Sequence, residues 1–286
     1  MSADTAPVRV PDDWFVNFHQ GLAARFWRAA GAAMRDADLA RVLRVLDLPP
    51  GAAVLDAPCG DGRIALGLVR AGHRVTGVDI ADGEVARASA AAAAAGLDAR
   101  FLTGDLRALP VAGPFDAVVS WGNSFGYLTP EDSVRSLAAM RAVLRPGGRL
   151  ALESLSVAET YLTGGVPERA EHVFGDVRMT AVNRYDAYES RVESELTFAA
   201  ASGRIERSRV AHRIHTSGEV VRMLRAAGFT GVALGDGEGP FVLGSPRLVA
   251  VAPPSARSAR RAAPGRRRRG RRRRARAPPR PRCRAR

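Results

Sequence analysis

The chain has 286 residues, a formal charge of +14 and two cysteines, which allow one large domain with a full core but neither a disulfide framework nor a metal-ligand cluster. No run is apolar for long enough to cross a membrane, and the first residues lack the pattern of a secretory signal. We therefore expect a cytoplasmic protein without membrane insertion and without a metal site.

Aromatic side chains are sparse in this chain, yet five of them gather near the N-terminus. They are Trp14, Phe15, Phe18, Phe26 and Trp27. In one interpretation this segment is helical and folds over a binding pocket as a lid. In the other, the aromatic side chains only bury a helix against a sheet. The sequence leaves both interpretations open.

Residues 53–80 predict a strand, a helix and a second strand. The apolar run 53–55 ends in an acid and is typical of a buried parallel strand. Residues 63–71 repeat apolar side chains at helical spacing, and residues 73–80 form the next apolar run. This order is the layout of an adenosine-binding βαβ unit.

The turn after the first strand has the features of a ligand loop. Gly60 and Gly62 lack a Cβ, so the backbone can turn sharply and a ligand can approach its amide groups. Asp79 ends the second strand, where an acid is placed to accept hydrogen bonds from ribose hydroxyls. We therefore predict that a nucleoside lies across this turn.

Two classes of cofactor share this layout. Residues 60–65 satisfy the loose dinucleotide pattern G-x-G-x-x-G/A, which leaves a nicotinamide-dependent oxidoreductase possible. However, Asp56 and Asp61 flank the turn, and carboxylates disfavour a pyrophosphate at a helix N-terminus. They suit S-adenosylmethionine better, because it carries an ammonium and a sulfonium and no phosphate.

The ordered motifs of residues 50–155 resemble those of class I S-adenosylmethionine-dependent methyltransferases of the small-molecule type. The family's loop D-x-G-x-G-x-G maps onto residues 56–62, with Pro58 in place of the first glycine, as in relatives with a D-x-P-C-G-x-G-R loop. LTGDLRALP, FDAVVSWGNSFGYL and LRPGGRLALE then follow in the family's order. In the family, the residue at Asp79 binds the ribose and the residue at Asp105 binds the adenine amino group. The resemblance implies a set of cofactor-binding residues: Asp56, Ala57, Cys59, Gly60, Gly62, Arg63, Asp79, Ile80, Gly104, Asp105, Leu106, Trp121 and Gly122.

The rest of the chain continues the alternation of strands and helices. Thr129 is a predicted N-cap with Pro130 at the first helical position, and residues 216–219 form a capping box. Residues 229–234 and 240–251 are predicted to close the sheet as an antiparallel hairpin. The expected fold is α/β, with a doubly wound, Rossmann-like and mostly parallel sheet.

Between residues 171 and 215 the pattern changes to short stretches typical of antiparallel strands with one solvated face. The resemblance implies that such an insertion covers the acceptor site or forms a dimer contact. We therefore predict five segments: an N-terminal helical lid (1–50), the S-adenosylmethionine-binding core (51–155), the inserted strands (156–215), a C-terminal helix with the closing strands (216–252) and a tail (253–286).

The tail carries the excess positive charge. Sixteen of the 43 basic residues, all arginines, lie in residues 253–286, which contain no acid, so the preceding part has 27 basic and 29 acidic residues. Such a segment repels itself, has no apolar face and is predicted to be disordered. It could bind nucleic acid non-specifically through phosphate charge, but it has no aromatic residue to stack on bases. A tail without function is the favoured interpretation.

Methyl transfer is an in-line displacement, so alignment and exclusion of water can supply most of the rate, and a base is not obligatory. If the acceptor must lose a proton, the candidates are His215, Tyr127 and His172, with His19 and His212 as further histidines. The three-residue spacing of His212 and His215 in an expected strand puts them on opposite faces. For each histidine alone, a surface or hydrogen-bonding role is favoured.

The loop after the fourth strand is best placed to contact an acceptor, because ligands bind at the carboxyl edge of such sheets. Asn123 and Tyr127 of this loop, together with Trp14 and Phe18, are the predicted substrate-binding residues. WGNSFGYL is not the N/D-P-P-Y/F motif that holds an amino acceptor in some methyltransferases, which weakens a role in nucleic-acid base methylation.

The sequence therefore predicts a methyltransferase that acts on an oxygen or nitrogen of a small molecule, as a monomer or homodimer. The alternatives are a nicotinamide-dependent oxidoreductase, a nucleic-acid-binding methyltransferase that uses the tail, and a protein that binds the cofactor without methyl transfer.

Overall fold

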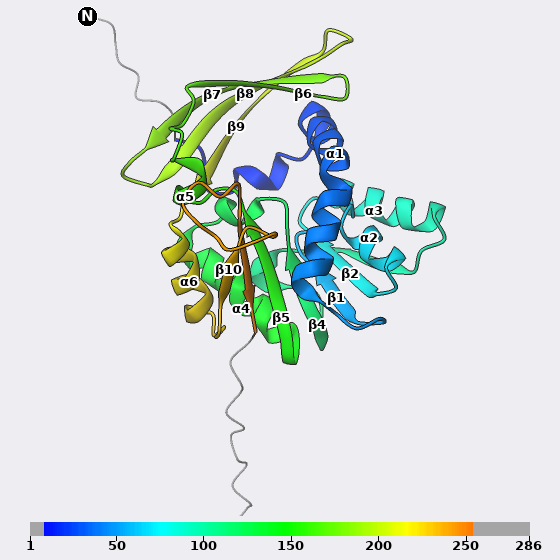
Figure 1. Ribbon diagram of the computed structural model, residues 1–286. Coiled ribbons are helices and arrows are strands. Elements are labelled where there is room, and N and C mark those ends of the chain that lie inside the picture. Colours follow the sequence, from blue (N-terminus) through cyan, green and yellow to red (C-terminus); the bar gives the residue numbers. More distant parts are fainter. Residues whose placement is uncertain (1–8, 254–286) are drawn as a thin grey trace, which may run out of the picture. The chain divides into compact units, whose positions relative to one another are not determined.

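Residues 9–253 are the part of the chain that the computed structural model describes, and they are built on two separate sheets (Figure 1). The larger sheet contains β1 (Ala53–Asp56), β2 (Arg74–Asp79), β3 (Ala99–Thr103), β4 (Phe115–Ser120), β5 (Leu144–Ser154), β10 (Ala233–Gly235) and β11 (Leu248–Ala252). The smaller sheet contains β6 (Arg169–Phe174), β7 (Val177–Asp186), β8 (Arg191–Ala200) and β9 (Ile205–Arg213).

The larger sheet has the strand order β10-β11-β5-β4-β1-β2-β3. The pairs from β3 to β5 are parallel, whereas β11 runs antiparallel to both β5 and β10. This is the doubly wound, mostly parallel sheet with an antiparallel C-terminal hairpin that the sequence predicts. The chain order reverses between β1 and β4, so the loops after these strands diverge and open a crevice.

Helices cover both faces of the larger sheet. On one face, α1 (Gly21–Leu46) and α2 (Ala65–Arg70) bury Val42, Leu46 and Leu68 against strand residues such as Val54 and Val119. On the other, α4 (Pro130–Val143) and α6 (Ser217–Ala226) contribute Leu137, Met140 and Leu224 to a second core. The remaining elements are α3 (Asp82–Ala94), α5 (Ala158–Tyr161), and the short helices η1 (Trp14–Asn17), η2 (Leu106–Ala108) and η3 (Ser124–Tyr127).

Two helix starts are fixed by the caps that the sequence predicts. The Thr129 side chain accepts a hydrogen bond from the Asp132 backbone N–H at 3.2 Å, ahead of Pro130. Thr216 and Glu219 exchange side-chain and backbone hydrogen bonds as a capping box. Both caps satisfy backbone donors that have no partner inside the helix.

The strands differ from the prediction in two places. The closing strands are shorter than expected, since β10 begins at Ala233 rather than at residue 229 and β11 at Leu248 rather than at residue 240. Between them Asp236 accepts the backbone N–H groups of Glu238 and Gly239 and turns the chain just after β10. The smaller sheet also begins earlier than the pattern change at Glu171, with the strand β6 at its edge. The exposed, charged side chains of β6 give no alternating apolar pattern from which it could be predicted.

The smaller sheet packs one face on the N-terminal segment. Phe18, Leu22 and Phe26 form a core with apolar residues of β7, β8 and β9, among them Phe198 and Val210. Figure 1 shows η1 and the first turns of α1 beneath this sheet. Phe18 and Phe26 are therefore buried against the smaller sheet, whereas Trp27 is exposed.

Two polar contacts anchor the same segment to β9. The Asp12 carboxylate accepts a hydrogen bond from the Arg213 guanidinium at 2.6 Å, and the Leu22 backbone N–H donates to Glu206 at 2.7 Å. Arg213 is buried and also donates to the backbone carbonyl of Tyr127 in η3. The N-terminal segment, the smaller sheet and the loop after β4 are thus tied together.

No helix within residues 9–253 has the length and apolar content needed to cross a membrane. The same residues contain no group of three side chains that could hold a metal ion. The predicted tail lies outside the described residues except for Pro253.

Candidate functional site

A cavity of about 360 Å³ lies at the carboxyl edge of the larger sheet. Its floor, the set of lining residues from the loops after β1, β2, β3 and β4, consists of Pro58, Cys59, Gly60, Asp61, Asp79, Ile80, Asp105, Leu106, Trp121 and Gly122. Its roof, the set of lining residues from residues 14–18, η3 and the smaller sheet, consists of Phe15, Phe18, Ser124, Phe125, Tyr127, Leu196, Val210 and His212. Residues of α1, among them Arg28 and Asp38, line a wall between floor and roof. The cavity occupies the crevice in which such sheets bind ligands.

The floor is held in shape by Asp79. One carboxylate oxygen accepts the Gly60 backbone N–H at 2.8 Å, and the other accepts the Ala81 backbone N–H at 2.9 Å. Gly60 has φ +53°, and beyond its chain neighbours no atom lies within 4 Å of the position that a Cβ would take. A side chain there would be strained and would fill the space beside the backbone. The floor thus leaves room for a ligand in contact with the loop.

Four predicted cofactor-binding residues lie behind the lining rather than in it: Asp56, Ala57, Gly62 and Gly104. The buried Asp56 carboxylate accepts the Ala65 backbone N–H at 3.1 Å and so holds the start of α2. Burial raises the pKa of Asp56 to about 7, although the charge of Arg63 opposes this shift. These positions shape the loop, and the other nine predicted residues line the cavity.

Asp105 is held in its charged form. Arg107 donates hydrogen bonds to Asp105 at 2.6 Å and to Asp132 of α4 at 2.8 Å. The hydrogen bonds from Arg107 lower the pKa of Asp105. Asp105 can therefore accept a hydrogen bond from an amino group in the cavity, as the family resemblance implies for adenine.

Cys59 is not suited to act as a nucleophile. Its side chain is buried in the floor, and burial raises the pKa of the thiol far above its ordinary value. A thiol that stays protonated reacts slowly, because the thiolate is the nucleophilic form. The backbone of this residue, rather than its sulfur, is the part that suits a ligand loop.

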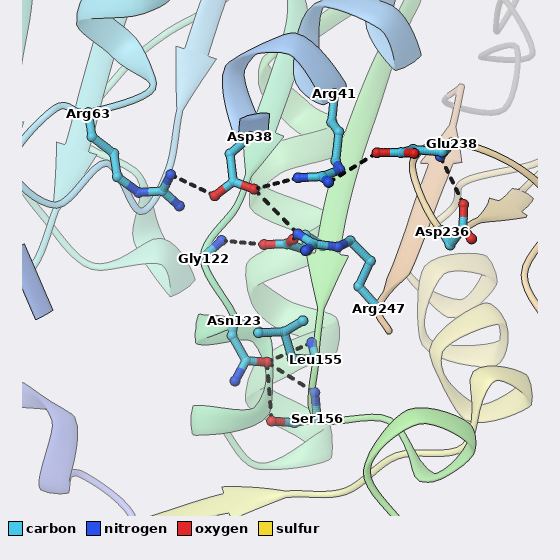
Figure 2. A network of polar contacts seen from close by, with 11 residues as sticks. Asp38, Arg41, Arg63, Gly122, Asn123, Leu155, Ser156, Asp236, Glu238 and Arg247 are labelled. Carbon is cyan, nitrogen blue, oxygen red and sulfur yellow. Dashed lines mark hydrogen bonds and ion pairs between the residues drawn. The ribbon is translucent and has the colours of Figure 1, made fainter. Parts of the chain in front are cut away.

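Asp38 of α1 is the centre of a polar network beside the floor (Figure 2). Its carboxylate, which is almost fully buried, accepts hydrogen bonds from Arg63 at 2.8 Å, Arg247 at 3.3 Å and Arg41 at 3.4 Å. Arg63 follows the loop after β1, and Arg247 directly precedes β11. Asp38 therefore joins three segments that are far apart in the chain.

Glu153 extends this network to the loop after β4. It ion-pairs with Arg247 at 2.5 Å and accepts the Gly122 backbone N–H at 3.0 Å. Glu153 and Asp38 line the cavity together with Arg63 and Arg247. Arg63 was predicted from its motif, but the other three were not, because sequence spacing gives no sign that α1, β5 and the segment before β11 meet here.

The loop after β4 is fixed by Asn123. This residue adopts a left-handed conformation with φ +67°. Its side-chain oxygen accepts the backbone N–H groups of Leu155 at 2.8 Å and Ser156 at 3.0 Å (Figure 2). Asn123 lines the cavity, but its oxygen is used to hold the loop on the end of β5.

Aromatic rings meet in the roof. The ring centroid of Tyr127 lies 4.6 Å from that of Trp14 and 5.1 Å from that of His212, and Trp14 and His212 are 5.5 Å apart. Trp14 itself supports the roof from behind, and its buried indole N–H has no hydrogen-bond partner within residues 9–253. Burial lowers the pKa of His212 to about 4 and raises that of Tyr127. Near neutral pH both side chains are therefore uncharged.

The other histidines are placed differently. His215 packs against Phe125 behind the lining, and burial lowers its pKa. His172 is exposed on β6 and does not line the cavity. His19 lines the cavity. Burial lowers its pKa, although the negative charges of Asp79 and Glu84 act in the opposite direction. Of the three main candidate bases, His215, Tyr127 and His172, only Tyr127 lines the cavity. His212, which the sequence indicates only as a further histidine, lines it as well.

The state of His212 can be measured directly. In a pH titration of the histidine ring signals by NMR, we expect the His212 signal to move only as the pH approaches about 4, because burial disfavours the imidazolium. Comparison with His212→Gln assigns the signal, and the denatured chain provides the ordinary midpoint. A His212 midpoint at or above that of the denatured chain would contradict the buried environment.

Comparison with known proteins shows similarity to methyltransferases. Residues 54–148 match the family model of a methyltransferase domain. An amino pentose methyltransferase from Micromonospora echinaspora, solved with bound S-adenosylmethionine, shares the fold with a TM-score of 0.63 and 24% identity, over 83% of this chain and 98% of that one.

Two curated relatives resemble parts of the chain. Nocamycin O-methyltransferase from Saccharothrix syringae is 34% identical over 201 residues, which are 67% of this chain and 64% of that protein. An S-adenosylmethionine-dependent Diels-Alderase from Talaromyces variabilis is 38% identical over 115 residues, or 37% of each protein. This chain thus spans less than two thirds of the length of either relative.

The fold, the glycine loop and the acid at the end of β2 define a cofactor-binding α/β enzyme. Its core is a class I S-adenosylmethionine-dependent methyltransferase domain, as the ordered motifs of the sequence predict. Both the enzyme class and the cofactor inferred from the sequence are confirmed.

Proposed function

We propose that this enzyme transfers a methyl group to an oxygen or nitrogen of a small molecule bound beneath the roof of the cavity. The observation that carries the proposal is the division of one cavity into a floor of cofactor-loop residues and a roof of aromatic and apolar side chains. The similarity to Nocamycin O-methyltransferase supports a small-molecule acceptor.

The residues of the floor fit S-adenosylmethionine. Asp79 would accept hydrogen bonds from the ribose hydroxyls, Asp105 would accept one from the adenine amino group, and the open space beside Gly60 would admit the methionine part of the cofactor. When bound, the cofactor supplies an electrophilic methyl group on a sulfonium. The roof positions the acceptor and keeps water away from the reacting atoms, which is where most of the rate of such a displacement arises.

His212 is the side chain we propose as proton acceptor, if the acceptor must lose a proton. It is uncharged near neutral pH and lines the cavity beside Tyr127. Because its pKa of about 4 makes it a weak base, it suits an acceptor that already has a free lone pair or a weakly held proton.

Calorimetric titration with S-adenosylmethionine and, separately, with NAD tests the cofactor assignment. We expect binding of S-adenosylmethionine alone, and a loss of at least about tenfold in affinity, roughly 1.4 kcal/mol, in Asp79→Ala, because the ribose acceptor is removed. Asp98→Ala, which removes an exposed acid outside the cavity, serves as the control and should bind as the wild type does. Binding of NAD alone, or of neither cofactor, would refute the proposal.

A second candidate function is cofactor binding without methyl transfer. The similarity to an S-adenosylmethionine-dependent Diels-Alderase favours it, although it covers only 37% of this chain. Retention of radiolabelled methyl on the bound cofactor, while an acceptor is consumed, would identify this case. The cytoplasmic location, the monomer or homodimer and nucleic-acid binding by the tail stay predictions from the sequence.

A further inference from the structure

The roof carries no charged side chain. Three of its members, Leu196, Val210 and His212, come from the inner face of the smaller sheet, and His212 is uncharged near neutral pH. The others are Phe15, Phe18, Ser124, Phe125 and Tyr127. An ion placed among these side chains would lose its hydration without gaining a partner, which is costly.

The arginines that line the rest of the cavity are already paired. Arg28 donates to Glu84 at 2.9 Å, Arg63 donates to Asp38 at 2.8 Å, and Arg247 ion-pairs with Glu153 at 2.5 Å. All three belong to α1, the loop after β1 or the segment before β11, and none belongs to the smaller sheet. Within residues 9–253, each cavity-lining arginine is thus neutralised by a buried carboxylate.

The roof is also rich in aromatic rings. Phe15 and Tyr127 lie nearly parallel, with an interplanar angle of 28° and centroids 6.1 Å apart, and Trp14 packs against both. Aromatic faces of this kind gain most from flat apolar partners.

From these observations we infer that the methyl acceptor is an uncharged molecule with a flat, largely apolar scaffold, and not one that carries a carboxylate or phosphate next to the reacting group. This inference rests on the proposed function and specifies the acceptor of the same cavity. An amine acceptor enters as the free base, since the roof offers no counter-ion. A hydroxyl acceptor enters protonated.

A matched pair of ring compounds tests the inference without knowledge of the natural acceptor. The full chain is loaded with S-adenosylhomocysteine, and the affinities of methyl 6-hydroxy-2-naphthoate and of 6-hydroxy-2-naphthoate are measured by the fluorescence of the naphthalene. The two probes share the ring system and differ in one group, which is an uncharged methyl ester in one and a carboxylate in the other. We expect the uncharged ester to bind at least about tenfold more tightly, equivalent to about 1.4 kcal/mol.

A charge placed in the roof should reverse this preference. In Leu196→Arg the carboxylate probe gains a partner and should bind more tightly than the ester. Val182→Arg places the same charge on the opposite, solvent-facing side of the smaller sheet and should leave the preference unchanged. Val210→Arg replaces the test variant if Leu196→Arg no longer binds S-adenosylhomocysteine.

Failure of the inference differs from failure of the proposed function. If the wild type does not bind S-adenosylhomocysteine, the proposed function is wrong. If it does, but the carboxylate binds as tightly as the ester or neither probe binds up to its solubility limit, only the inference about the acceptor is overturned.

Discussion

Replacement of Asp38 by alanine is expected to lower the free energy of unfolding by about 3 kcal/mol and to weaken S-adenosylmethionine binding at least about tenfold. Asp38 is almost fully buried and accepts hydrogen bonds from Arg41, Arg63 and Arg247. Removal of one partner from such a cluster leaves cations without compensation. The arginine side chains are 17–19% exposed, so water relieves part of this cost and the low end of the usual range applies.

The effect on the cofactor follows from what the network joins. Without Asp38, Arg63 loses its hydrogen-bond acceptor beside the cofactor loop, and Arg247 keeps only Glu153, which also holds Gly122. The floor should therefore lose its fixed geometry. Urea denaturation measures the first effect, and calorimetry at a temperature where the variant is folded measures the second.

Glu238→Ala is the matched control for this experiment. It removes the other acid that pairs with Arg41, but Glu238 is 63% exposed at the protein surface. Exposed ion pairs contribute less than about 1 kcal/mol, so stability and cofactor affinity should stay near the wild type. A variant Asp38→Ala that matched this control would show that the network is dispensable.

Replacement of Asp56 by asparagine is expected to make the protein more stable above pH 7. Burial raises the pKa of Asp56 from its ordinary value of 3.8 to about 7, so the folded state favours the protonated form. The stability associated with this group is fully present below pH 3.8 and is lost as the pH rises to about 7. A pKa shift of about three units corresponds to a decrease of as much as about 4 kcal/mol in the free energy of unfolding.

Asparagine cannot ionise, yet its oxygen can still accept the Ala65 backbone N–H. The stability difference between Asp56→Asn and the wild type should therefore grow in favour of the variant between pH 4 and 7 and level off above. Denaturation of both proteins at several pH values measures this difference, and subtraction removes the contribution of other groups such as His212. Asp56→Ala, which lacks the acceptor, should gain less. A difference that does not vary with pH would show that Asp56 is charged in the folded protein.

The parts of the fold that local chemistry determines were predicted from the sequence. The caps at Thr129 and Thr216 depend on neighbouring residues. Asp79 is recognised because it ends the apolar run that follows the glycine loop and the next helix. The mostly parallel, doubly wound sheet followed from the alternation of strands and helices.

The missed features depend on contacts between distant segments. Nothing near Asp38 in the sequence shows that Arg63 and Arg247 will meet it, and nothing near His212 shows that Tyr127 and Trp14 will surround it. His212 lies in β9 whereas His215 lies beyond its end, so the predicted arrangement on opposite faces of one strand does not apply. Which of the two faces the cavity depends on the packing of the smaller sheet. Chemistry that arises where two sheets and a helix converge is not encoded in any local pattern.

The contacts that anchor the N-terminal segment also determine at which stage of folding the roof can form. Asp12 and Arg213 are 201 residues apart, and Leu22 and Glu206 are 184 apart, so these bonds close almost the largest loops within the described chain. During synthesis, Asp12 and Leu22 leave the ribosome long before β9 and find these partners only when β9 has been made. Closure of long loops costs entropy before it is repaid by contacts. The roof therefore cannot be completed until β9 has been made and has packed on the N-terminal segment.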